Sequence, residues 1–156
     1  MLQTTFECYQ DTVISSASHD EHGDFWIGSN FGLIHYNPVS QKQTHILTNL
    51  FTEVNMVQCD QRGKVWIGAD NLLFAWLIQE QKFVLFGESN GAIQNEYLPN
   101  ARLVNNEGDV YIGGVKGMLR IDGQLLLNTS EMPELQLLDI IINGEPAQNK
   151  LYSHPA

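Results

Sequence analysis

Short apolar runs alternate with polar, glycine-containing turns along most of this chain, and no amphipathic helical stretch of useful length interrupts them. Three segments share one pattern. Each has a turn that opens with Asp or Asn and closes with Gly, then a short apolar run with a large aromatic residue, then a second Gly. The segments are residues 20–28, 60–68 and 105–113. Their spacing of about 40 residues is typical of a repeat architecture.

Each position of this repeat has a physical reason. Asp or Asn opening a turn caps the backbone with its side chain, and the closing Gly accepts a positive φ. The β-branched and aromatic residues that follow favour a strand. The aromatic residue alternates with apolar neighbours, which indicates burial on both faces, and the final Gly lets another backbone approach closely. The repeat residues that we interpret as structural are Gly23, Trp26, Gly28, Gly63, Trp66, Gly68, Gly108, Tyr111 and Gly113.

Further strands are expected on both sides of each repeat segment. The predicted strands lie at 13–18, 33–36, 43–47, 54–59, 72–76, 82–86, 101–104 and 118–121. Two repeats have another glycine before the next strand, at Gly32 and Gly117, whereas the middle repeat has Asn71 one residue earlier. Because Asn tolerates a left-handed turn, we predict a shortened but equivalent hairpin there.

About four short strands per repeat predict an all-β fold, namely a β-propeller fragment of three four-stranded antiparallel blades. A sandwich fits less well, because its strands do not repeat in sequence. We expect blade one at residues 11–50, blade two at 51–90 and blade three at 91–130, with residues 1–10 as the outer strand of a preceding blade. A propeller needs at least about four blades, so three repeats indicate a fragment. Its uncovered blade faces predict self-association.

Charge narrows the range of partners. Eight Lys and Arg residues face 18 Asp and Glu residues, for a net charge of −10. Without a basic cluster, the chain is not expected to bind nucleic acid or an anionic membrane. An uncharged sugar or a protein remains open as a partner. No apolar run is long enough to span a bilayer, and residues 1–5 lack a signal-peptide pattern, so either the protein is cytosolic or its targeting segment lies upstream.

Candidate chemistry is sparse. His19, Asp20, Glu21 and His22 could all ligate a metal, but the repeat requires only the Asp that opens the turn, and consecutive residues rarely converge on one ion. We therefore predict no metal site and no cofactor. Cys8 and Cys59 lack the spacing of a zinc or redox motif and are interpreted as buried thiols.

Aromatic side chains offer the one candidate for ligand contact. The repeat-position residues Trp26, Trp66 and Tyr111 are interpreted as packing between blades, against the alternative of a sugar-stacking platform. Trp76 falls in no repeated position that we recognise, so it is the candidate ligand-binding residue. No catalytic residues are predicted, because the sequence has no nucleophile triad, phosphate-cradling loop or opposed carboxylate pair.

The repeat core, together with Gly32-Leu33 and Tyr36-Asn37-Pro38, resembles the two-component regulator propeller repeat. Residues 91–97 and 113–117 resemble the lead-in and core of that family's last blade. Residues 132–145 look like the first strand of the triple-tyrosine domain, an immunoglobulin-like domain that follows the propeller in the family. The domain start is placed at residues 131–156, and the resemblance covers residues 5–147.

This resemblance implies a periplasmic sensor region of a hybrid two-component system histidine kinase of the Bacteroides type. In such relatives a membrane helix and a kinase follow, signals pass by phosphorelay, and many respond to oligosaccharides. Since this chain carries no kinase motif, it is not expected to be an enzyme itself. The alternative functions are a non-catalytic protein-interaction scaffold and, with least support from the short loops, a propeller enzyme acting on carbohydrate.

Overall fold

The computed structural model describes residues 11–46, 48–125, 141–142 and 145–146, the last four by their backbone alone. The chain divides into two compact units, Met1–Leu126 and Leu127–Ala156. In the second unit, β12 (Ile141–Ile142) and β13 (Glu145–Pro146) form a short antiparallel hairpin. The outer strand expected at residues 1–10 and the rest of the expected immunoglobulin-like domain lie outside the described residues.

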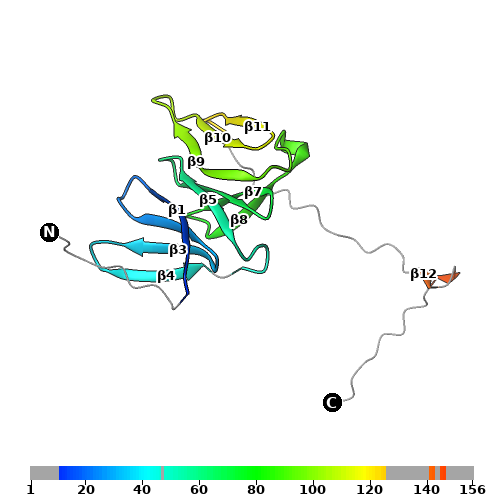
Figure 1. The fold of residues 1–156 in the computed structure, drawn as a ribbon, viewed down its shortest axis with the longest axis horizontal. Coiled ribbons are helices and arrows are strands. Elements are labelled where there is room, and N and C mark those ends of the chain that lie inside the picture. The colour runs from blue at the N-terminus through cyan, green and yellow to red at the C-terminus, as the bar shows by residue number, and fades with distance from the viewer. Residues whose placement is uncertain (1–10, 47, 126–140, 143–144, 147–156) are drawn as a thin grey trace, which may run out of the picture. The chain divides into compact units, whose positions relative to one another are not determined.

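The described part of the first unit consists of three antiparallel sheets (Figure 1). The first sheet contains β1 (Ile14–His19), β2 (Phe25–Ser29), β3 (Gly32–Asn37) and β4 (Lys42–Ile46). The second contains β5 (Val54–Cys59), β6 (Lys64–Ala69), β7 (Leu72–Leu77) and β8 (Lys82–Phe86). The third contains β9 (Tyr97–Val104), β10 (Val110–Gly114) and β11 (Gly117–Ile121), and a single 3-10 turn, η1 (Glu88–Asn90), precedes it. In each sheet, strands adjacent in sequence are adjacent in space.

The all-β prediction is confirmed, and β5 and β8 match the predicted strands to the residue. The strand predicted at 101–104 is longer than expected, because β9 already begins at Tyr97. The third sheet differs, because it has three strands in the described residues where four were expected. After β11 the described chain makes a turn at residues 123–124, and residues 126–130 of the predicted blade lie outside the described part.

The repeat turns are built as the sequence indicated. In the first, the side-chain Oδ1 of Asp20 accepts hydrogen bonds from the backbone N–H groups of His22 and Asp24, at 2.9 and 3.1 Å. Asp60 and Asn105 accept the equivalent pairs of bonds in the other two repeats. Because these bonds satisfy backbone donors inside the turn, the turn forms from local sequence alone.

The shortened hairpin predicted for the middle repeat is wrong. Leu72 closes the hairpin opposite Ala69, as Gly32 does opposite Ser29, so the loops have the same length. What changes is the backbone conformation. Asp70 and Asn71 both take a positive φ, 49° and 63°, as a two-residue type I′ turn requires. The glycine of the other repeats is therefore unnecessary.

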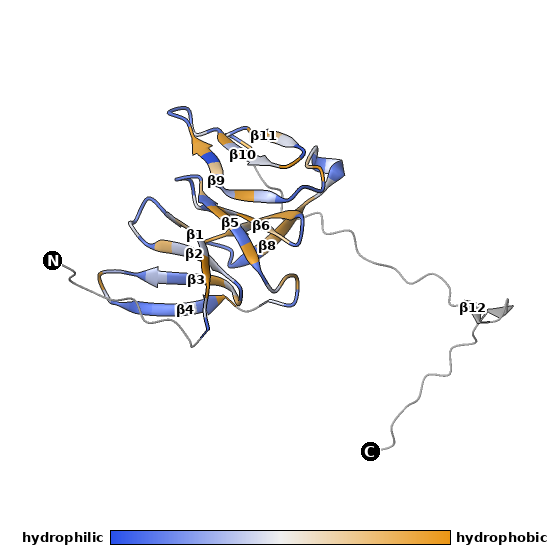
Figure 2. Cartoon of the chain, in the orientation of Figure 1, coloured by the Kyte–Doolittle hydropathy of each residue, from blue (hydrophilic) through white to orange (hydrophobic). Residues whose placement is uncertain are grey.

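The sheets stack in chain order, with the second sheet between the first and the third (Figure 1). Figure 2 shows that hydrophobic residues are concentrated in the strands of the middle sheet. Strands β1 and β2 pack on β5, and β5 and β6 pack on β9. The repeat glycines permit this close approach. A Cβ on Gly28 would lie 2.6 Å from Val54, and one on Gly68 would lie 2.7 Å from Tyr97, each in the next sheet.

Candidate functional site

A cleft of about 380 Å³ opens between the first and second sheets. Three parts of the chain line it: the turn from Asp20 to Asp24 with the start of β2, the outer strands β3 and β4, and the facing residues Trp76, Ile78 and Gln81. The hydrogen bonds that Asp20 accepts from the backbone of His22 and Asp24 fix the conformation of this turn. This cleft is the candidate ligand-binding site, since it combines aromatic and polar groups from two sheets.

Two tryptophan rings form the inner wall of the cleft, one from each sheet. Trp26 donates its indole N–H to Oδ2 of Asp20 at 2.9 Å, and its ring lies 4.5 Å from the ring of His35. Trp76 packs against Phe83, with 4.6 Å between ring centroids. The indole nitrogen of Trp76 is buried and has no hydrogen-bond partner within the described part of the chain.

The structure places Trp76 in a repeated position, contrary to the sequence interpretation. Trp76 pairs with Val65, the residue before the repeat aromatic, just as Tyr36 pairs with Phe25 in the first sheet. The different residue types hid this equivalence. The side chain belongs to the core cluster between the sheets and is 8% exposed, so only its edge is available to a ligand.

Two polar side chains of the cleft bond the carboxylate of Asp24. Oδ2 of Asp24 lies 2.8 Å from Nε2 of His35, and Oδ1 accepts a bond of 2.7 Å from the side-chain amide of Asn37. At the mouth, Lys42 and Gln81 are exposed. The site therefore presents fixed donors and acceptors beside an apolar wall, an arrangement suited to a polar, uncharged ligand. Sequence analysis missed Asp24, His35 and Asn37, because only sheet pairing brings them together.

The His19–His22 cluster serves the turn. Asp20 is buried and accepts three hydrogen bonds, two from backbone N–H groups and one from Trp26. Nδ1 of His19 lies 3.1 Å from the carbonyl oxygen of Asp20. Within the described ranges, no group of three or more His, Cys, Asp or Glu side chains is arranged to hold a metal ion.

Cys59 is a buried free thiol in the core. Its burial raises the pKa of the thiol to about 12, because the protein interior disfavours the thiolate. This agrees with its interpretation as a structural residue. Cys8 lies outside the described residues.

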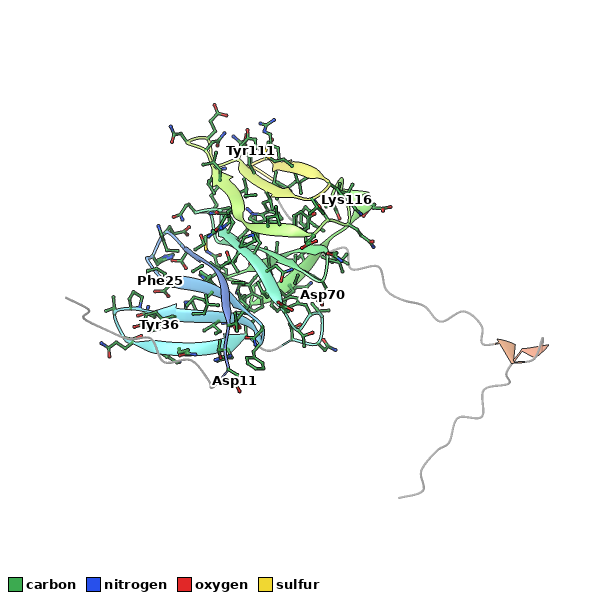
Figure 3. The ribbon with its side chains drawn as sticks, viewed as in Figure 1. Asp11, Phe25, Tyr36, Asp70, Tyr111 and Lys116 are labelled. Carbon is green, nitrogen blue, oxygen red and sulfur yellow. The ribbon has the colours of Figure 1, made fainter. Side chains whose placement is uncertain are left out.

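The repeat aromatics have different environments in the three sheets. Trp26 and Trp66 are buried, each on the face that meets the next sheet. Tyr111 is half-buried on the open face of the third sheet, labelled in Figure 3, where it lines an apolar hollow of about 400 Å³ with Leu103 and Met118. Both tryptophans pack within the protein interior. Tyr111 occupies the same position without a described sheet to cover it.

Comparison with known proteins gives a match in structure. No family model matches the sequence, and no curated protein does. One similar solved structure is the extracellular domain of a protein described as a one-component system from B. thetaiotaomicron. It is 21% identical with a TM-score of 0.57, and the match covers 86% of this chain and 18% of the other. Another is the extracellular domain of a protein described as a hybrid two-component system from the same organism. It is 15% identical with a TM-score of 0.64, and the match covers 89% of this chain and 21% of the other.

These matches confirm the fold class and agree with the resemblance of the repeats to two-component sensors. This chain spans about a fifth of the length of each solved structure. Both matched structures are extracellular domains, and no helix in the described residues is long and apolar enough to cross a membrane.

Proposed function

We propose that this chain is part of the periplasmic sensor region of a hybrid two-component system histidine kinase, in which it takes part in signal detection without catalysing a reaction. The observation that carries the proposal is the structural match over 89% of the chain to the extracellular domain of a hybrid two-component system. The three repeats in register support it independently, because they were identified from sequence. In this proposal the kinase lies elsewhere in the full protein and the signal leaves by phosphorelay.

The signal that we propose is a neutral oligosaccharide. The cleft between the first two sheets offers hydrogen-bonding side chains beside the edges of two indole rings, which suits the mixed polar and apolar surface of a sugar. Two carboxylates line the cleft, Asp20 and Asp24, and the chain carries a net charge of −10, so an anionic ligand is disfavoured. Trp76 contributes an edge to this wall, and the exposed Lys42 and Gln81 provide donors at the mouth.

Isothermal titration of the purified chain with a panel of neutral oligosaccharides tests the ligand. Gln81→Ala should weaken binding by about fivefold, the effect of losing one hydrogen bond of about 1 kcal/mol. Gln124→Ala is the matched control, because Gln124 is exposed and lies in the turn after the third sheet. Equal affinity in Gln81→Ala and the control, or no binding by any sugar in the panel, contradicts the ligand proposal.

Transcription tests the sensor role separately. In the source bacterium, deleting the codons for residues 11–125 should abolish induction of the regulated genes by polysaccharide, because detection needs this segment. Induction that survives the deletion, or a gene that encodes neither a membrane helix nor a kinase, contradicts the sensor role whatever sugar binds.

A protein-interaction scaffold is the second candidate, and the open apolar face of the third sheet favours it. A scaffold would bind a protein through that face and would leave transcription unchanged by sugar. The deletion experiment therefore separates the two functions.

A further inference from the structure

A series of hydrogen bonds in the first sheet ends on the ring of His35. The backbone N–H and the hydroxyl group of Ser40 both donate to Oδ1 of Asn37, at 2.7 and 2.9 Å. The side-chain amide of Asn37 donates to Oδ1 of Asp24 at 2.7 Å, and Oδ2 of Asp24 lies 2.8 Å from Nε2 of His35. This network connects the turn between β3 and β4 to a ring that lines the cleft.

Each hydrogen bond of the network fixes the direction of the next one. The two bonds from Ser40 engage Oδ1 of Asn37, so the NH₂ group of Asn37 must face Asp24. A carboxylate only accepts hydrogen bonds, so Nε2 of His35 carries the hydrogen that it shares with Asp24. In a neutral imidazole the other ring nitrogen is then an acceptor. The network therefore leaves Nδ1 of His35 unprotonated.

The repeat itself does not require a histidine at this position. His35 pairs with the repeat aromatic of its sheet, and the second sheet forms without any part of the network: the positions equivalent to Asp24, His35 and Asn37 hold Lys64, Ala75 and Leu77. In the third sheet the equivalent residue is Arg120, which bonds Asp109. Because an arginine offers only donors, the first sheet alone presents an acceptor at this position.

The ring of His35 is held within the wall of the cleft and is partly open to it. The ring of Trp26 lies 4.5 Å away, with 33° between the two planes. On the other side His35 pairs with Thr44, which is exposed and also lines the cleft. The side chain of His35 is 27% exposed. Among the described residues its one hydrogen bond is that to Asp24, so Nδ1 is available to a ligand.

We propose that His35 is a specificity-determining residue of the cleft, where Nδ1 accepts a hydrogen bond from a hydroxyl group of the ligand. Asp24, Asn37 and Ser40 are positioning residues that hold the ring in the tautomer that this contact needs. The inference rests on the proposed function, since a neutral sugar presents hydroxyl hydrogens, and it adds the residue that recognises them.

Nitrogen-15 NMR of the free chain tests the tautomer without any ligand. At about pH 8, above the ordinary imidazole pKa of about 6.5, the ring of His35 should show a protonated Nε2 and an unprotonated Nδ1. The ring signals that disappear in His35→Phe identify this residue among the five histidines. Phenylalanine keeps a ring against Trp26, so this variant should fold with a melting temperature close to that of the parent.

Asp24→Asn should reverse the tautomer, a result that a purely structural role of Asp24 does not predict. Asn37 still presents its NH₂ group, so the introduced amide turns its oxygen to Asn37 and its own NH₂ group to His35. Nε2 must then accept, and the hydrogen moves to Nδ1. Asp70→Asn is the matched control, because Asp70 is exposed in the turn between β6 and β7 and does not line the cleft. The control should leave the signals of His35 unchanged.

Titration of the parent with neutral tetrasaccharides of glucose, galactose, mannose and xylose tests the contact with the ligand. A sugar that binds should shift the Nδ1 resonance of His35 more than the Nε2 resonance, because Nδ1 gains the hydrogen bond. His35→Phe should weaken the affinity for this sugar about fivefold, the effect of losing one hydrogen bond. Gln124→Ala, which changes an exposed residue outside the cleft, should keep the affinity of the parent.

Four results count against the inference and separate it from the proposed function. An unprotonated Nε2 or a doubly protonated ring in the free parent shows that the network does not set the tautomer. A folded Asp24→Asn chain that keeps the tautomer of the parent shows the same. A sugar that binds the parent and His35→Phe equally, without shifting Nδ1, contacts other groups and leaves the proposed ligand class intact. Binding by no sugar of the panel contradicts the ligand class itself, together with the contact that rests on it.

Discussion

Replacing Trp66 by Ala tests the packing between the second and third sheets most directly. Trp66 lies on β6, is buried, and meets the ring of Phe86 edge-on at 4.9 Å between centroids. Its indole nitrogen has no hydrogen-bond acceptor among the described residues. Packing therefore accounts for what this side chain contributes to stability, and truncation removes packing from both sides of an interface between sheets.

The expected magnitude follows from this environment. Truncating a buried Trp costs about 3–5 kcal/mol, and the upper half of that range applies where the surroundings cannot collapse. Two hydrogen-bonded sheets are held apart by their own backbone ladders, so the cavity should persist. For a chain of this size each kcal/mol shifts the melting temperature by about 2–4 °C, so a cost of about 4–5 kcal/mol predicts a drop of about 8–20 °C. Trp66→Phe should cost no more than about 1.5 kcal/mol, because it also removes an unpaired buried donor.

Thermal melts and urea unfolding, followed by circular dichroism, provide the measurement. Val39→Ala is the control, because Val39 is exposed in a turn. A melting temperature for Trp66→Ala within a degree of the parent would refute the assignment of the repeat aromatic to the core. A Trp66→Phe variant as unstable as Trp66→Ala would show that the indole N–H contributes through a partner that the packing argument omits.

Three further results are expected. Trp26→Phe should destabilise the fold by about 1–3 kcal/mol more than Trp66→Phe, because it leaves a buried carboxylate oxygen of Asp20 without its hydrogen-bond donor. Urea unfolding of both variants measures the difference. Cys59, whose pKa burial raises to about 12, should resist alkylation at about pH 8 in the folded state and react in denaturant, as site-resolved mass spectrometry would show; rapid labelling of the native chain contradicts its burial. The pKa of the Asp109 carboxyl is lowered, first by a hydrogen bond from the backbone N–H of Gly123. The ionised carboxylate therefore stabilises the fold fully above the ordinary carboxyl pKa of 3.8, and this stabilisation is lost as the pH falls through the lower pKa of the folded state. Asp109→Asn should flatten the acid limb of stability in melts between about pH 6 and about pH 2, and an unchanged limb would contradict this.

The local architecture could be predicted from the sequence because its causes are local. Asp20, Asp60 and Asn105 cap their own turns within four residues, and the apolar runs between turns have the length and composition of strands. The middle hairpin was predicted wrongly for a reason that is also local. A two-residue hairpin loop can also form without glycine, when both of its residues adopt a positive φ, as Asp70 and Asn71 do.

The candidate cleft was beyond sequence analysis. Asp24, His35 and Asn37 are far enough apart along the chain that only the register of β2 and β3 shows them to be neighbours. The equivalence of Trp76 and Tyr36 was also hidden from sequence analysis. The two residue types differ, and only their pairing with Val65 and Phe25 shows that they occupy the same position in their sheets.

The sequence by itself determined the turns, the strands and the identity of each sheet face, since hydrogen bonds and side-chain alternation within one repeat suffice for these. The tertiary structure decided which of three similar faces is covered. Leu73 is buried and Met118 is exposed at equivalent positions, because burial depends on the sheet that stacks opposite and not on the residue itself. The pattern of a repeat specifies a surface that fits a neighbour, and the neighbour must be supplied by another sheet.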